Sequence, residues 1–342
     1  MGDKILSVSI AAYNVASTLE EALIPFTDEK IRDSVDVMIV DDGSKDETAE
    51  IALRYEKTFP GTFRLLTKEN GGWGSTLNVG MKNACGKYFK QLDGDDYYSR
   101  ENLEDFLKFL GETEADLVYS PFVTFDDATG GIIRILGAYS GYYSFFPLNK
   151  TIPLSECDNF IPAMHAITVK TDVLQQNKIS IMEHCFYTDV EYVLKTYNMC
   201  RTVTFFEKPI YYYRLARNGQ SMSQTGVRKH YNDHQRMLMS MMEYYQKKVT
   251  DEHTKKIFKK RLLEVCNMQY IFYFALKTTP KHKRELRNFD RILKQNYPFF
   301  YNQIDGRQVS LLRKTSFCGY GLVSWQKMKK DKRLKQNIFE GV

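Results

Sequence analysis

Two aspartates that follow an apolar segment are the residues best placed to do chemistry in this chain. Residues 88–92 are rich in aromatic and apolar residues (Tyr88, Phe89, Leu92), which predicts a mostly buried strand, and Asp93-Gly94-Asp95-Asp96 follows directly. Carboxylates at the end of a buried strand need a cation, because removing their charge from water is costly. Asp93 and Asp95 offer the oxygen ligands that Mg²⁺ or Mn²⁺ prefers, and Gly94 lets the backbone bend between them. A solvated acidic turn is the competing interpretation.

The elements around these aspartates alternate between strand and helix. Separated by helical segments, five strands are predicted at residues 4–12, 36–40, 63–66, 88–92 and 116–125. This alternation predicts an α/β fold with a mostly parallel, Rossmann-like sheet and helices on both faces. A later strand is predicted at residues 163–169.

Polar loops follow three of these strands. They are Ala11-Ala12-Tyr13-Asn14, Asp41-Asp42-Gly43-Ser44 and Asp93-Gly94-Asp95-Asp96. The carboxyl ends of neighbouring parallel strands lie side by side, and ligands bind there. One such loop alone indicates only a turn. Three together predict a cleft that binds a polar ligand through a metal ion.

A glycine-rich segment, Asn70-Gly71-Gly72-Trp73-Gly74-Ser75, precedes a helix predicted at residues 76–84. Backbone N–H groups at the start of a helix would face a phosphate. The segment lacks both the Gly-x-Gly-x-x-Gly pattern and the Gly-Lys-Ser/Thr phosphate loop. These absences disfavour a dehydrogenase and a nucleoside triphosphatase.

Taken in order, these motifs resemble the inverting family 2 glycosyltransferases of GT-A fold. The residues that carry the resemblance are Tyr13-Asn14, Val40–Asp46, Asn70-Gly71-Gly72, Leu77–Gly80 with Ala84–Tyr88, and Leu92–Asp96. The resemblance covers about the first 125 residues, and an acid-bearing helix near residue 189 extends it. It is specific for the fold and the general activity, and it does not identify the sugar.

The resemblance implies a nucleotide-sugar donor, most simply UDP-linked, and it assigns residues to it. Asp93 and Asp95 would hold Mn²⁺ or Mg²⁺, which neutralises the diphosphate as the glycosidic bond breaks. Asp93 would also lie near the ribose, and Asp42, with Asp41 beside it, would read the nucleobase edge. The other implied donor-binding residues are Ala12, Tyr13, Asn14, Asn70, Gly71 and Gly94. For Tyr13, ordinary core packing is an equally good interpretation.

Displacement by an acceptor hydroxyl needs a base on the opposite face of the sugar. In the family this base is an acid that opens a helix, and here Asp189 fits that position. Many relatives have Glu-Asp there, whereas this chain has Thr188 before Asp189. Glu191 lies two residues further on and would point to a different helix face. The sequence therefore favours Asp189 as the base and leaves Glu191 as the alternative.

Four further residues have weaker assignments. Many family members place an arginine near the donor phosphates where this chain has Leu77, so Arg214 and Arg217 are candidate replacements. A solvated surface pair is the competing view, slightly ahead for Arg217. His165 and Trp73 are candidates for the acceptor pocket, although interior packing is the commoner role for both.

The charge distribution and the change in pattern predict two regions, residues 1–227 and 228–342. The first has 22 Lys and Arg against 32 Asp and Glu, and the second has 26 against 10. The second region reads as long amphipathic helices at residues 231–248, 255–276 and 281–295. We therefore expect a GT-A catalytic domain followed by a basic α-helical region that engages the acceptor or a membrane surface.

The basic region has three interpretations. A solvated helical face is the simplest. Contact with an anionic membrane is the favoured one, because Lys and Arg cluster near Phe317, Trp325 and residues 327–335. Nucleic-acid binding is not expected, since no recognised module is present. Family members that build bacterial surface or capsular glycans often act on lipid-linked acceptors, which would explain the basic region.

The cysteine pattern and the apolar runs of the sequence indicate the cellular compartment. The six cysteines show no Cys-x-x-Cys pair, which indicates free thiols in a reducing environment. No secretory signal and no membrane-spanning run is apparent. The expected location is the cytoplasm, peripheral on the cytoplasmic face of the membrane if the basic region binds lipid.

The hypothesis from sequence is a metal-dependent inverting glycosyltransferase of cell-surface or capsular polysaccharide synthesis, with a glycan or lipid-linked glycan as acceptor. One alternative is a nucleotidyltransferase that forms sugar nucleotides. It would need a basic, glycine-rich first loop, and residues 11–16 hold no charged residue. The other alternative is a non-enzymatic membrane or nucleic-acid adaptor that uses the basic region. Sequence leaves the donor sugar, the linkage and the oligomeric state open.

Overall fold

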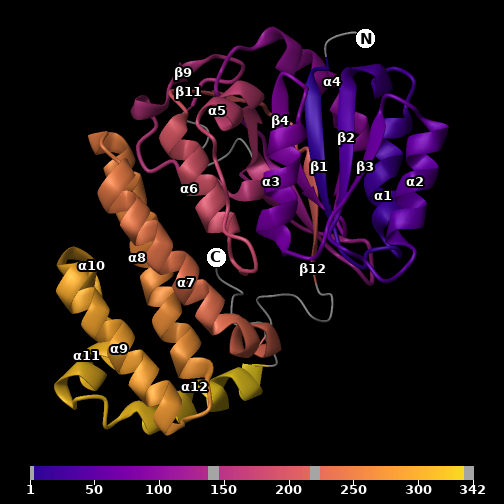
Figure 1. The fold of residues 1–342 in the computed structure, drawn as a ribbon. Helices are drawn as coiled ribbons and strands as arrows, with labels where there is room; N and C mark the ends of the chain where they lie inside the picture. The colour runs from indigo at the N-terminus through magenta and orange to yellow at the C-terminus, as the bar shows by residue number, and fades with distance from the viewer. Residues whose placement is uncertain (1–3, 138–145, 216–223, 335–342) are drawn as a thin grey trace. The chain divides into compact units, whose positions relative to one another are not determined.

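The computed structural model describes residues 4–137, 146–215 and 224–334. The chain divides into two compact units, Met1–Arg217 (the N-terminal unit) and Asn218–Val342 (the C-terminal unit). The boundary expected from sequence after residue 227 lies inside the first helix of the C-terminal unit, α7 (Gln224–Lys248). Figure 1 shows the strands in the N-terminal unit, and the C-terminal unit is helical in its described residues.

The N-terminal unit is built on an eight-stranded sheet. In spatial order its strands are β3 (Phe63–Thr67), β2 (Val35–Asp41), β1 (Leu6–Ala12), β4 (Tyr88–Asp93), β10 (Ile167–Lys170), β6 (Leu117–Tyr119), β11 (Thr202–Phe205) and β9 (Ile152–Pro153). The four strands from β3 to β4 are parallel to one another. Beyond β4 the sheet is mixed, because β10 runs antiparallel to both β4 and β6. The predicted α/β fold is confirmed, with its parallel part where the polar loops lie.

Helices cover the parallel part of the sheet. All seven residues of β2 are buried, so both of its faces are covered. The helix α3 (Trp73–Asn83) packs on β1 and β2, and α2 (Thr48–Thr58) packs on β3 and β2. The remaining helices of this unit are α1 (Leu19–Leu23), α4 (Arg100–Glu112), α5 (Thr171–Gln176) and α6 (Asp189–Met199).

A second, four-stranded sheet has the order β5 (Tyr97–Tyr98), β12 (Tyr211–Leu215), β7 (Phe122–Asp126) and β8 (Ile132–Leu136). The strand predicted at residues 116–125 is in fact two strands. Pro121 lies between β6 and β7, and the two strands belong to different sheets. Similarly, the strand predicted at residues 163–169 begins with a 3₁₀ turn, η5 (Met164–Ala166), and β10 starts only at Ile167.

In the described residues the C-terminal unit consists of α7, α8 (Glu252–Ala275), α9 (Pro280–Asn296), α10 (Pro298–Gln303), α11 (Arg307–Lys314) and α12 (Tyr320–Leu334). The predicted helical region is confirmed. One buried polar cluster joins its helices, because Asp290 accepts hydrogen bonds from Tyr270 Oη (2.6 Å) and Arg313 Nε (2.8 Å). Within the described part of the chain, no helix has both the length and the apolar character that crossing a bilayer requires.

Candidate active site

The register of the parallel strands aligns the three polar loops. Ala12 at the end of β1 pairs with Asp41 at the end of β2, and Ala11 pairs with Asp93 at the end of β4. Asp41 in turn pairs with Thr67 at the end of β3. The segments that follow these strands therefore leave the sheet at the same edge, as the sequence predicts.

The first polar loop is fastened to the second. The backbone N–H of Asn14 donates to Ser44 Oγ (3.0 Å), and Asn14 Oδ1 accepts from the N–H of Lys45 (2.8 Å). Asn14 has φ +52°, a left-handed conformation that asparagine tolerates better than most residues. The side chain of its neighbour Tyr13 is about half exposed (49 %), so Tyr13 is not core packing and its ring can meet a ligand.

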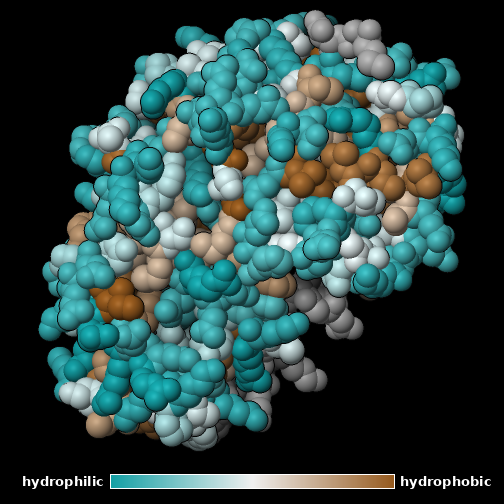
Figure 2. Space-filling view, viewed as in Figure 1, coloured by the Kyte–Doolittle hydropathy of each residue, from teal (hydrophilic) through white to brown (hydrophobic). Residues whose placement is uncertain are grey.

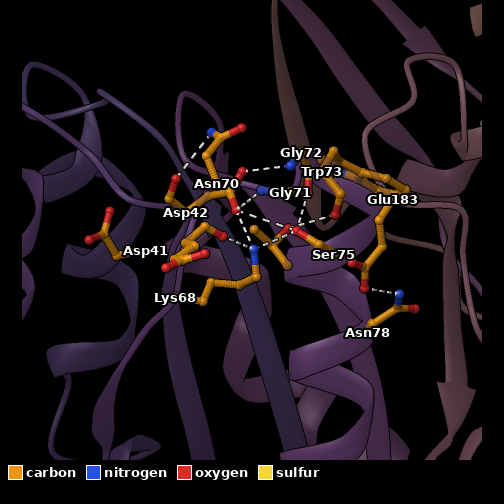
Figure 3. Close-up of polar contacts among 12 residues, drawn as sticks. Asp41, Asp42, Lys68, Asn70, Gly71, Gly72, Trp73, Ser75, Asn78 and Glu183 are labelled. Atoms are coloured by element: carbon orange, nitrogen blue, oxygen red, sulfur yellow. Dashed lines mark hydrogen bonds and ion pairs between the residues drawn. The ribbon is translucent and has the colours of Figure 1, made fainter.

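Asp42 is the centre of the polar network in Figure 3. Its carboxylate accepts hydrogen bonds from the backbone N–H groups of Gly71 (2.9 Å) and Gly72 (2.8 Å) and from Lys68 Nζ (2.6 Å). Asn70 Nδ2 donates to the backbone oxygen of Asp42 (3.1 Å). Asp42 is buried, and these contacts compensate its charge. Asp42 therefore fixes the glycine-rich loop, whatever contact it also makes with a nucleobase.

The glycines of this loop permit close backbone packing. Gly72 has φ +81° and caps the N-terminus of α3. A Cβ on Gly74 would lie 2.2 Å from the backbone oxygen of Met182. The backbone N–H of His184 donates to the oxygen of Gly71 (2.6 Å). The same loop thus joins the Asp42 region to residues 181–185, which lead into α6.

Asn78 makes a second set of contacts with residues 181–185. Asn78, on α3, exchanges hydrogen bonds with the backbone of Ile181 (2.8 and 2.9 Å) and donates to Glu183 Oε1 (3.0 Å). Figure 3 shows Asn78 and Glu183 beside the Asp42 network. The motif residue Asn78 therefore acts in positioning the segment before α6.

The acidic loop after β4 brings three carboxylates together. The pKa of the Asp93 carboxyl is raised to about 7, mainly by burial and then by the charges of Asp95 and Asp189, while a hydrogen bond from Trp73 Nε1 (2.7 Å) acts in the opposite direction. Asp96 is buried, accepts from Tyr211 Oη (2.6 Å), and its pKa is raised by burial and by Asp93 and Asp95. This concentration of negative charge suits a divalent cation.

Gly94 has no room for a side chain. Its N–H donates to the oxygen of Ala11 (3.0 Å), and a Cβ would lie 2.8 Å from Val15 Cγ2. The acidic loop is thereby packed directly on the first polar loop. Glycine is required here for this close approach, whereas its φ lies outside the left-handed region, so the bend between the aspartates does not itself demand glycine.

The structure separates the two candidate bases. Asp189 is the first residue of α6 and interacts electrostatically with Asp93. Glu191 is buried, and its two carboxylate oxygens accept from the N–H of Met182 (3.0 Å) and from Lys195 Nζ (2.6 Å). Asp189 therefore belongs to the acidic cluster, whereas Glu191 secures the segment before α6.

A comparison with protein-family models identifies the domain that carries the polar loops. The model described as "Glycosyl transferase family 2" matches residues 7–171, which include all three polar loops and the glycine-rich loop. Residues 7–171 form a glycosyltransferase family 2 domain. Asp189 and Arg214 lie beyond the matched residues of this family 2 domain.

Two curated relatives align with parts of the chain. An "Uncharacterized glycosyltransferase RP339" of Rickettsia prowazekii is 38 % identical over 110 residues, which are 32 % of this chain and 33 % of that protein. The "Minor teichoic acid biosynthesis protein GgaB" of Bacillus subtilis is 33 % identical over 127 residues, which are 36 % of this chain and 14 % of that protein. The alignments thus span a third or less of either relative.

Two solved structures share the fold of the whole chain. The S. aureus protein TarS, residues 1–349 in complex with UDP-GlcNAc, superposes with a TM-score of 0.65 at 18 % identity, covering 97 % of this chain and 92 % of that one. The mannosyltransferase PcManGT from Pyrobaculum calidifontis, in complex with GDP-Man and Mn²⁺, gives a TM-score of 0.52 at 15 % identity, covering 96 % and 87 %. At these identities the likeness shows the fold, and the family 2 domain is GT-A-like with helices after it.

Neither arginine prediction gains support from the structure. Arg214, which follows the family 2 domain in sequence, is buried and pairs with Asp127 Oδ1 (2.6 Å) and with Glu21. Its Nε donates to the backbone oxygen of Asp95 (2.6 Å). Arg214 therefore stabilises the acidic loop through the Asp95 carbonyl, and its charge is already paired with two carboxylates. Arg217 lies outside the described residues, as does Lys335 at the end of the basic cluster.

Some contacts of the family 2 domain were not foreseen from the sequence. Trp73 was expected to pack or to stack on sugar, yet its indole N–H binds Asp93. Lys68 links Asp42 to Ser75 Oγ (2.8 Å), and its only sequence signal is a position two residues before Asn70. His165 lies in η5 and not in a strand, stacked on Phe122 at 5.0 Å between ring centroids.

Proposed function

We propose that this chain is an inverting, metal-dependent glycosyltransferase that moves a sugar from a UDP-linked donor to an acceptor hydroxyl. One observation carries the proposal: at the end of the parallel strand β4, the charges of Asp95 and of Asp189, which belong to separate segments, both raise the pKa of Asp93. The family 2 domain supports the reaction class. The UDP-GlcNAc bound to TarS supports the donor class.

The donor would lie along the loops that the structure aligns. Tyr13 would flank the nucleobase with its exposed ring, and Asn14, Asp41 and Asp42 would border the same pocket. The backbone at Ala12, Asn70, Gly71 and Gly94 would line the nucleotide. Because Lys68 and two backbone amides already hold the Asp42 carboxylate, this pocket is organised before the donor binds.

The chemistry needs a charge to offset the diphosphate and a base for the acceptor. Asp93 and Asp95 would hold Mn²⁺ or Mg²⁺, which offsets the charge on the diphosphate leaving group. The oxygen ligands and the raised pKa of Asp93 fit such an ion. Asp189 would take the proton of the acceptor hydroxyl as that oxygen attacks the anomeric carbon. Attack from the face opposite the leaving group inverts the configuration.

The acceptor is proposed to be a growing cell-surface or capsular polysaccharide, free or lipid-linked. The similarity to GgaB, whose name places it in minor teichoic acid synthesis, supports this acceptor class. The C-terminal unit would contact anionic lipid at the cytoplasmic face of the membrane. Its visible face in Figure 2 is largely hydrophilic, and Leu311, Leu322 and Trp325 are about half exposed.

Activity is tested with the purified full chain, a panel of nucleotide sugars, and Mn²⁺ or Mg²⁺. Asp95→Ala and Asp189→Asn should each lower donor turnover by at least about a hundredfold. Asp105→Ala, at an exposed ion pair with Lys208, is the matched control and should leave turnover unchanged. Undiminished turnover in either site variant would remove that residue from the mechanism. Release of pyrophosphate from a nucleoside triphosphate would point instead to a nucleotidyltransferase.

Membrane contact is tested separately. The full chain should sediment with vesicles that contain phosphatidylglycerol and remain free of pure phosphatidylcholine vesicles, and salt should weaken the binding. Equal binding to both kinds of vesicle, or to neither, would contradict an electrostatic contact and leave the enzymatic proposal intact.

A further inference from the structure

One histidine, His165, lies beside the acidic loop, with a ring nitrogen within 4.8 Å of a carboxylate oxygen of Asp93. It belongs to the 3₁₀ turn η5, which leads directly into β10, and β10 pairs antiparallel with β4. Lys90 fastens this arrangement, because its Nζ donates to the backbone oxygen of His165 (2.7 Å).

Aromatic rings fix the orientation of the His165 imidazole. It stacks on Phe122 and on Tyr213, with centroid distances of 5.0 and 4.5 Å. Tyr211 meets it edge-on at 4.9 Å. Three rings leave the imidazole little freedom to turn, so the direction of its nitrogens is set by packing.

Both ring nitrogens of His165 are shut off from solvent, and neither has a hydrogen-bond partner in the described residues. Leaving a buried polar atom without a partner is unfavourable, because its hydrogen bonds to water are lost and not replaced. The buried histidine of the C-terminal unit provides a contrast, since His234 Nδ1 is 2.6 Å from Gln269 Oε1. A ligand for the imidazole lone pair would satisfy one of these two nitrogens.

Two carboxylates lie within reach of such a ligand. A ring nitrogen of His165 and one carboxylate oxygen each from Asp93 and Asp96 all lie within 4.8 Å of one another. Atoms that share a small divalent ion lie at most about 4.2 Å apart, twice the metal–ligand distance, so a small contraction would close this set on an ion.

Asp96 retains capacity for an ion although it is already hydrogen-bonded. It accepts from Tyr211 Oη (2.6 Å) and from the backbone N–H of Arg214 (2.7 Å). A carboxylate has about four acceptor positions, so two remain. Hydrogen bonds of this kind commonly orient a metal-binding carboxylate.

We propose that His165 is a ligand of the divalent cation, giving one ring nitrogen beside the carboxylates of Asp93 and Asp96. The inference rests on the proposed function, in which Asp93 and Asp95 hold the ion, and it adds a nitrogen ligand from across the sheet. Imidazole binds transition-metal ions better than it binds Mg²⁺. The site should therefore prefer Mn²⁺, and His165 should be the residue that sets this preference.

The direct test uses electron spin-echo spectroscopy of Mn²⁺ bound to the full chain in the presence of UDP. A coordinated imidazole gives a ¹⁴N modulation, which should be present in the unaltered chain and absent in His165→Gln. The matched control is His253→Gln on α8, which should keep the modulation. The Mn²⁺ affinity of His165→Gln should fall by at least about tenfold, and the Mg²⁺ affinity by less.

A labelled sample makes the test independent of any substitution. Incorporation of ¹⁵N-histidine into the unaltered chain should replace the ¹⁴N modulation with that of ¹⁵N. Bound Mn²⁺ without a nitrogen signal, or a signal that persists in a folded His165→Gln variant, would overturn the ligand assignment while leaving the proposed function standing. Failure of Mn²⁺ to bind at all with UDP would overturn both.

Discussion

The contrast between Glu191 and Asp189 gives the sharpest prediction about the base. The two acids are two residues apart on α6, yet their surroundings differ. Glu191 is only 2 % exposed, and each of its two carboxylate oxygens has a partner, Lys195 Nζ for one and the N–H of Met182 for the other. We therefore expect Glu191→Gln to lower stability and to leave catalysis in the folded molecules nearly unchanged.

The size of the stability loss follows from the contacts. Breaking one partner of a buried ion pair costs about 3–5 kcal/mol. Lys195 is 18 % exposed and also donates to the oxygen of Ser180 (2.7 Å), so water and that carbonyl compensate part of its charge. A glutamine can still accept one of the two hydrogen bonds. A loss of about 2 kcal/mol is expected, which for a domain of this size lowers Tm by roughly 4–8 °C.

The assay combines thermal unfolding with sugar transfer measured well below Tm. Glu191→Gln should keep kcat within about threefold of the unaltered chain, while Asp189→Asn should lower kcat by about 10²–10⁴-fold with little change in Tm. A hundredfold loss of kcat in folded Glu191→Gln, together with an active Asp189→Asn, would show that the roles of the two acids are reversed.

Two further predictions concern the glycine-rich loop and the acidic loop. Gly74→Ala should destabilise the N-terminal unit in urea unfolding, because the added Cβ would lie 2.2 Å from the backbone oxygen of Met182. Gly111→Ala on α4, where the added Cβ would meet only Ile5 at 3.7 Å, should instead stabilise the unit by about 0.5–1 kcal/mol. Equal effects of the two substitutions would refute the packing argument. Mn²⁺ affinity in the presence of UDP should fall about tenfold per pH unit below about 7, since burial raises the pKa of Asp93 to about 7 and the protonated carboxyl must lose its proton to bind. Calorimetry in two buffers should find that Mn²⁺ binding releases protons at pH 6, about one from Asp93 and more if Asp96 also binds the ion in its ionised form, and no release at pH 6 would contradict this.

Local patterns predicted the parallel part of the fold and the position of its polar loops. The run that ends at Asp93 and the one that ends at Asp41 have the composition of buried strands, and parallel pairing then brings their ends together. The choice of Asp189 came from the family resemblance, which places an acid at the start of a helix, and helix geometry added only that Glu191, two residues on, points to a different face.

Partners that lie far apart in sequence could not be predicted in this way. Arg214 looked available for phosphate because its counter-ions, Glu21 and Asp127, are distant along the chain. Likewise, the indole of Trp73 finds Asp93 only through tertiary packing. In the mixed half of the sheet, the strands at β6 and β10 were predicted, but the antiparallel direction of β10 was not, because it depends on pairing between segments that are far apart in sequence.

The junction between the glycine-rich loop and residues 181–185 has a consequence for engineering. The proposed nucleotide pocket and the segment before the proposed base share one support, since Gly71 donates its N–H to Asp42 and accepts a hydrogen bond from the N–H of His184. A graft that transplants only the nucleotide half from another enzyme would carry a loop shaped for a different partner segment. We therefore expect that donor preference can be exchanged when residues 68–78 and 181–189 are replaced together by the corresponding segments of one other protein.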